Sequence, residues 1–175
     1  MEKIEKLTWP TITLHWLVGV MFLGVFVLGF LMVDMPAPDK FEWYDLHKSL
    51  GVLILMVAVP RLLWRLKGGG LKPVSQSSLG INLLAKIIQW GLLFATLAMP
   101  LSGLAMSIGS GRTVSIFGTE VIAEGAEIPW LEELASTIHH MAVELIIIAL
   151  ALHIIGAIKH QLVDRDRTLL RMLGK

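Results

Sequence analysis

Long runs of apolar residues, separated by short polar stretches, divide the chain into four segments. The first, residues 11–33, contains no Asp, Glu, Lys or Arg. At a rise of about 1.5 Å per residue, it is long enough to cross the roughly 30 Å hydrocarbon core of a bilayer. The same pattern predicts further spans at residues 46–66, 81–106 and 135–162. We therefore expect an all-α membrane four-helix bundle that forms a single domain over residues 1–175.

The composition agrees with this pattern. Hydrophobic residues make up 55% of the chain and charged residues 17%, with a mean hydropathy of +0.71. These values lie outside the usual range for a soluble domain, so we expect membrane lipid around the protein and no nucleic-acid partner. The sequence has no cysteine, which excludes disulfides, thiolate-held iron–sulfur clusters and c-type haem attachment. Any cofactor must be held by histidine, methionine or oxygen ligands.

Basic residues are unevenly distributed between the two ends of the predicted bundle. The end with both termini carries 12 of the 15 lysines and arginines, and the other end carries only Lys40, Lys48 and Arg112. If this is a bacterial inner-membrane protein, the positive-inside bias places both termini in the cytoplasm. Against its three cations the outer end holds nine carboxylates, a local balance of −6: Asp34, Asp39, Glu42, Asp45, Glu120, Glu124, Glu127, Glu132 and Glu133.

Four histidines fall at two depths of the predicted bundle. His15 lies near the cytoplasmic start of the first span, and His47 lies at the outer start of the second. In the fourth span, His139 and His153 are separated by 14 residues, which places them on one helix face about 21 Å apart along the axis. His140 lies about 140° from that face. Depth therefore pairs His15 with His153, and His47 with His139.

Facing imidazoles at two levels are what two six-coordinate b-type haems require. A single histidine in a membrane helix is about as often an ordinary hydrogen-bond partner between helices as it is a cofactor ligand. Four histidines that pair by depth are harder to explain in that way. A small metal ion would need its ligands gathered in one place, whereas these are divided between two levels. The pattern favours bis-histidine haem.

Four stretches carry a resemblance to a known family. They are LHWLVGVMF (residues 14–22), LHKSLGVLILMVAVPRLLWR (46–65), SGRTVSIFG (110–118) and LHIIGAIKHQLVDRDRTLLRML (152–173). Together they resemble the bacterial cytochrome b561 family of four-helix membrane dihaem proteins, over nearly the whole chain.

The resemblance implies two haem b groups, a cytoplasmic-membrane location and electron transfer. It implies axial haem-iron ligands at His15, His47, His139 and His153. Members of this family exchange electrons with the quinone pool, so ubiquinone is the expected partner. One branch oxidises superoxide at the outer face and passes the electron to ubiquinone.

Other basic residues are candidates for contacts to the cofactors. Arg61 and Arg65, one turn apart, suit the propionates of the inner haem, although snorkelling membrane anchors would look the same. For the outer haem, the candidates are Lys48 and Arg112. Elsewhere, His160 with Lys159 at the cytoplasmic edge is a candidate quinone or propionate contact.

Glu144 is the one carboxylate inside a predicted span, and it shares a helix face with His140. Such a pair marks a proton route for quinone chemistry or a buried hydrogen bond, either to a neighbouring helix or to a second copy of the protein. The sequence assigns no catalytic residue, and it leaves the oligomeric state open.

Three functions fit these observations. The first is an electron carrier that links the quinone pool to an outer-face donor or acceptor, such as a periplasmic redox protein. The second is a superoxide oxidase that reduces ubiquinone, although an acidic outer face opposes the approach of an anion unless the few cations focus the field. The third is a haem-bearing membrane anchor subunit for a dehydrogenase or hydrogenase.

Overall fold

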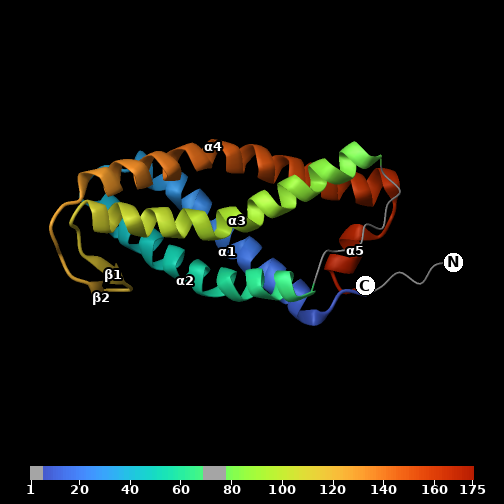
Figure 1. The fold of residues 1–175 in the computed structure, drawn as a ribbon, viewed down its shortest axis with the longest axis horizontal. Coiled ribbons are helices and arrows are strands. Elements are labelled where there is room, and N and C mark those ends of the chain that lie inside the picture. Colours follow the sequence, from blue (N-terminus) through green and yellow to red (C-terminus); the bar gives the residue numbers. More distant parts are fainter. Residues whose placement is uncertain (1–5, 69–77) are drawn as a thin grey trace.

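Four long helices run alongside one another in the computed structural model, which describes residues 6–68 and 78–175 (Figure 1). They are α1 (Trp9–Val33), α2 (Asp39–Gly68), α3 (Leu79–Gly109) and α4 (Pro129–Lys159). Each is long and apolar enough to cross a membrane, α4 together with the turn that follows it. The predicted all-α membrane bundle is confirmed. Lys3 and Lys72, which entered the charge count, lie outside the described residues.

The helices begin before the apolar runs that predicted them. The first turn of α2 carries Asp39 and Glu42, and carboxylates at a helix N-terminus interact favourably with the helix dipole. In α1 and α4 a proline occupies the first turn. Proline lacks a backbone N–H, but the N–H groups of the first turn have no partner within the helix, so no helical hydrogen bond is lost. Hydropathy locates the part of a helix that lies in lipid, whereas these polar turns extend each helix beyond it.

A short hairpin follows α3, between the third and fourth predicted spans. Strands β1 (Val114–Ile116) and β2 (Thr119–Ile122) pair antiparallel. The two turn residues, Phe117 and Gly118, have φ values of 48° and 81°. Positive φ at both central residues is the hallmark of the type I′ turn, whose twist suits a two-residue hairpin. We call this end of the bundle the hairpin end and the opposite end the termini end.

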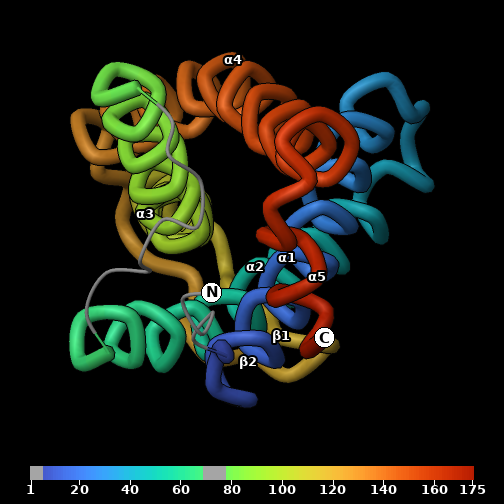
Figure 2. Tube along the Cα trace, turned by 90° about the vertical axis from the view of Figure 1, so that its right-hand side faces the viewer, coloured from blue at the N-terminus to red at the C-terminus, as the bar shows by residue number. Residues whose placement is uncertain are grey.

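The bundle packs in the order α1, α2, α3, α4, so that α2 lies between α1 and α3 and α3 packs along α4 (Figure 2). A buried cluster at its centre joins three helices: Phe22 and Val25 of α1, Ile54 and Ala58 of α2, and Ile146 of α4. Of the four helices, α4 is the least buried. The helices that carry the candidate histidines are thus held together at mid-depth.

The C-terminal segment folds back onto α1 at the termini end. A π-helical turn, His160–Asp164, continues α4, and Arg165 and Arg167 then reverse the chain with positive φ values. The short helix α5 (Thr168–Met172) follows. The indole N–H of Trp16 donates a hydrogen bond to the Met172 carbonyl at 2.7 Å, which fastens α5 to α1.

Candidate functional site

The four predicted histidines form two facing pairs. The ring centres of His15 on α1 and His153 on α4 are 6.2 Å apart. Nearer the hairpin end, the ring centres of His47 on α2 and His139 on α4 are 6.4 Å apart. All four side chains are half-buried. The structure therefore brings together the same partners that the depth argument pairs, one pair at each of two levels.

Two glycines make room for the pair at the hairpin end. A Cβ added at Gly29 of α1 would lie 3.1 Å from Cε1 of His47, and one added at Gly103 of α3 would lie 3.4 Å from Cε1 of His139. The bare backbone lets each helix approach the edge of an imidazole ring. Neither residue can be recognised from the sequence, because Gly19 and Gly24 on the same helix as Gly29 have open space around them and look the same in the sequence.

Two of the imidazoles have a further polar partner at their Nδ1 atoms. The hydroxyl oxygen of Ser102, a buried residue on α3, lies 2.9 Å from Nδ1 of His139. At the other level, Nη2 of Arg61 lies 3.2 Å from Nδ1 of His15. Because a guanidinium only donates hydrogen bonds, His15 accepts at Nδ1. A metal-ligating histidine usually donates its second N–H to a neighbour that fixes the ring, and the Ser102 hydroxyl can accept such a bond from His139. Arg61 cannot, because it only donates.

The other basic candidates lie at both ends of the bundle. Arg65, one turn after Arg61, places its guanidinium carbon 5.8 Å from the centre of the Trp90 ring. Lys48 forms an ion pair of 2.6 Å with Asp45, and Arg112 is exposed just before the hairpin. Of these four basic candidates, Arg61 is the one that contacts a histidine of the two pairs.

The remaining candidates lie on α4 and just after it. Lys159 pairs with Asp164 at 2.6 Å, and His160 Nδ1 lies 2.6 Å from Asp166 Oδ2. His140 and Glu144 are both exposed on the outside of α4, although the His140 ring centre is only 6.0 Å from that of His139.

Comparison with known proteins identifies the family of this chain. A family model described as prokaryotic cytochrome b561 matches residues 6–175. The chain belongs to this family. It is 33% identical to "Cytochrome b561 homolog 2" of Escherichia coli (strain K12), over 92% of this chain and 87% of the relative. It is 28% identical to "Probable superoxide oxidase CybB" of Yersinia pestis, over 98% of this chain and 97% of the relative.

Membership of the cytochrome b561 family makes this chain a bacterial multi-pass membrane protein of electron transfer that binds haem b. The histidine pairs fit that cofactor. Metal–imidazole bonds are about 2.0–2.1 Å long, as measured for zinc. Once the two ring radii are subtracted, separations of 6.2 and 6.4 Å between ring centres leave room for one metal ion between the two rings of each pair. At Gly29 the missing side chain leaves space beside the His47 ring, which a Cβ would occupy.

Asp166 holds the turn between α4 and α5 in its charged form. Burial alone would raise the pKa of this carboxyl, but the backbone N–H and side chain of Thr168, with His160, lower it below its usual value. A carboxyl whose pKa falls on folding contributes stability above its unfolded pKa of about 3.9, and that stability is lost as the pH drops through the lower, folded value.

We therefore expect Asp166→Asn to loosen α5, by about 1–2 kcal/mol of local stability, because the charged acceptor of two hydrogen bonds is lost. Hydrogen exchange of the α5 amides measures this. Protection in the unaltered protein should stay constant from neutral pH down to about pH 4 and fall below it. The variant should be less protected at neutral pH, and the two proteins should converge once the pH drops below the folded pKa of Asp166. Equal protection of the two proteins at neutral pH would show that Asp166 has no such role.

Proposed function

We propose that this chain is a dihaem electron carrier of the bacterial cytoplasmic membrane. His15 and His153 hold an inner haem b through its iron, and His47 and His139 hold an outer one. The observation that carries the proposal is the pair of ring separations, 6.2 and 6.4 Å, at two levels of one bundle. Because His139 and His153 are about 21 Å apart along α4, the two levels together make a path for electrons through most of the hydrocarbon core.

The chain supplies ligation, spacing and a dry environment for this path. Haem, when bound, supplies reversible one-electron chemistry. The buried cluster of Phe22, Ile54 and Ile146 excludes water between the two levels. Ser102 orients His139 through the hydrogen bond to its Nδ1.

Basic side chains are placed to bind the propionates. Arg61 and Arg65 serve the inner haem, and Lys48 and Arg112 serve the outer one. An imidazole that gives Nε2 to a metal carries its proton on Nδ1. The guanidinium of Arg61, which donates to Nδ1 of His15 in this structure, must then turn elsewhere, and a propionate is the acceptor that suits it.

The charge distribution orients the protein with both termini in the cytoplasm and the hairpin outside. Ubiquinone is the partner that we expect in the membrane, with His160 and Lys159 as contacts for a quinone or a propionate at the cytoplasmic edge. Both side chains already pair with carboxylates, so a ligand there would have to share or displace those pairs.

Superoxide oxidation coupled to ubiquinone reduction is a second candidate, favoured by the name of the relative from Yersinia pestis. The acidic hairpin end opposes it, because an anion is repelled there. A haem-bearing anchor subunit for a dehydrogenase or hydrogenase is a third candidate, which the short connections between the four helices suit.

The test is to mix the purified protein anaerobically with a short-chain ubiquinol and follow the haem spectra by stopped flow. An electron carrier should be reduced by the quinol or, once reduced, be reoxidised by the quinone. Superoxide, generated separately, should reduce the haems rapidly only if the second candidate is correct. An anchor subunit alone should respond to neither reagent, and that result would refute the proposal.

A further inference from the structure

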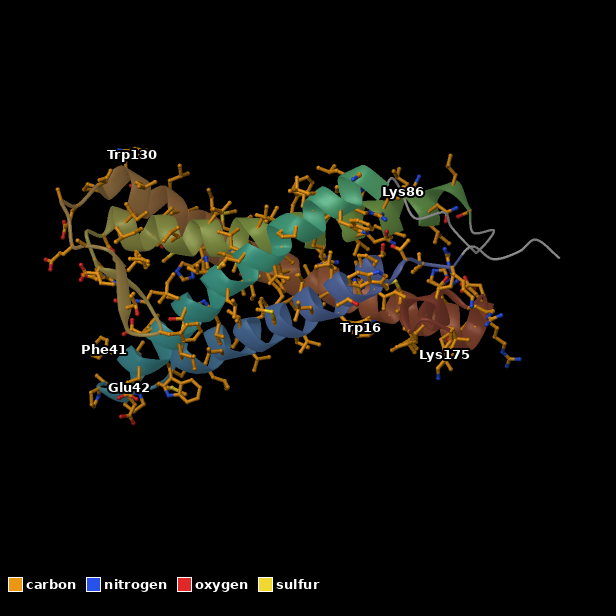
Figure 3. The ribbon with its side chains drawn as sticks, turned by 90° about the horizontal axis from the view of Figure 1, so that it is seen from below. Trp16, Phe41, Glu42, Lys86, Trp130 and Lys175 are labelled. Carbon is orange, nitrogen blue, oxygen red and sulfur yellow. The ribbon has the colours of Figure 1, made fainter. Side chains whose placement is uncertain are left out.

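The hairpin end of the bundle is an exposed acidic surface. Phe41, Glu42 and Trp130 lie there, at the opposite end from Lys86 and Lys175 (Figure 3). Eight of the nine carboxylates of this end are exposed: Asp34, Asp39, Glu42, Asp45, Glu120, Glu124, Glu127 and Glu133.

The three cations of this end offset only three of its nine carboxylates, which leaves a local balance of −6. Lys48 is paired with Asp45 at 2.6 Å. The ammonium of Lys40 donates to the Val33 carbonyl at 2.9 Å and lies 5.6 Å from the centre of the Tyr44 ring. Two of the three cations of this end are therefore held close to the protein. The field at this surface repels small anions and attracts cations or basic proteins.

Large apolar side chains are exposed among these carboxylates. Phe117 at the tip of the hairpin is 61% exposed, and Val121 on β2 is 56% exposed. Phe41 and Trp130 are exposed to a similar degree. Aromatic groups surrounded by polar residues are typical of surfaces that bind another protein.

This surface is joined to the histidine pair below it. Strand β1 packs on α2, and the backbone N–H of Phe117 donates to Oγ of Ser49 at 2.9 Å. Ser49 is almost fully buried and follows His47 by two residues. The hairpin therefore rests on the turn of α2 that carries His47, and a protein bound to the hairpin lies close to the outer level.

We propose that the hairpin end is the docking surface for a basic, one-electron redox protein, which exchanges electrons with the outer haem. This inference rests on the proposed function. In each exchange the metal centre of one protein loses one electron and that of the other gains it, and no covalent bond forms or breaks. Charge complementarity selects a basic protein over superoxide as the outer partner.

The test uses the full-length, haem-loaded protein in nanodiscs, with mitochondrial cytochrome c as the basic probe and an acidic plastocyanin as the opposite probe. Binding is measured with both partners oxidised, and electron transfer is measured by stopped flow. We expect cytochrome c to bind, and both its affinity and its rate to fall about tenfold or more between low and physiological salt. Plastocyanin should bind much more weakly.

A triple variant, Glu120→Gln, Glu124→Gln and Glu127→Gln, should weaken cytochrome c binding several-fold and slow the transfer equally. The matched control keeps the charge, with aspartate at the same three positions, and should behave as the unaltered protein. Reduction by a small neutral reductant should be the same in all three proteins. Affinity that does not depend on salt, equal binding of plastocyanin, or equal behaviour of the glutamine and aspartate variants would each overturn the docking surface.

Failure of the proposed function has a different signature. If His139→Ala retained both haems, the assignment of the outer haem site would be wrong. The salt-dependent binding of cytochrome c would be unaffected by that result. Faster reduction by superoxide than by reduced cytochrome c, undiminished at physiological salt, would assign the surface to the small anion and refute the docking proposal.

Discussion

His139→Ala should remove the outer haem and leave the inner one, and His153→Ala should do the reverse. Each substitution deletes one of the two imidazoles of a facing pair, so that a single histidine remains at that level. Six-coordinate b-type haem depends on both axial ligands. A redox titration of the purified proteins, followed optically, should show two b-type transitions in the unaltered chain and one in each variant. The surviving transition should differ between the two variants.

His140→Ala is the matched control for this experiment. The residue is next to His139 in the sequence, but its side chain is exposed on the outside of α4. We expect this variant to keep both transitions, with only a small shift in the outer potential because the two rings are 6.0 Å apart. Equal haem content in the unaltered protein, His139→Ala and His153→Ala would contradict the assignment. Circular dichroism at equal concentration shows whether each variant is folded.

The pairing of the histidines follows from periodicity, which is why the sequence could predict it. A separation of 14 residues is close to four full helical turns, so His139 and His153 must share a face whatever packs against them. The membrane then confines His15 and His47 to the depths at which their helices place them. The same reasoning predicts the helical spans but not the polar first turn of α2, because hydropathy detects only the apolar part of a helix that lies in lipid.

Features that depend on tertiary contacts could not be predicted in this way. Phe117 is an unusual residue for a turn position with positive φ, where asparagine, aspartate or glycine is usual, and its N–H is held by Ser49, 68 residues away in sequence. The return of α5 to α1 likewise depends on the bond between Trp16 and Met172. The sequence places Lys48 beside His47, yet its ammonium is engaged by Asp45.

Gly29→Val should weaken the outer haem site selectively. Even a Cβ at this position would lie 3.1 Å from Cε1 of His47, tighter than ordinary contact, and the two methyl groups of valine add further volume. The ring must turn or α1 must move away from α2. Overpacking of this kind costs about 1–3 kcal/mol, which corresponds to roughly 5- to 150-fold weaker retention of the outer haem. The inner pair, one haem level away, should be unaffected.

Gly24→Val provides the comparison that separates crowding of the ring from a general effect of valine in α1. Gly24 lies on the same helix, and a Cβ there would meet nothing within 4 Å. Both variants make the same change in helix propensity, so any difference between them comes from contact with His47. Haem titration of the apoproteins should give normal occupancy of both sites for Gly24→Val and a weakened outer site for Gly29→Val. Identical titrations of the two variants would mean that the space beside the His47 ring can accommodate a larger side chain at Gly29. The close approach of α1 to His47 would then have no part in holding the outer haem.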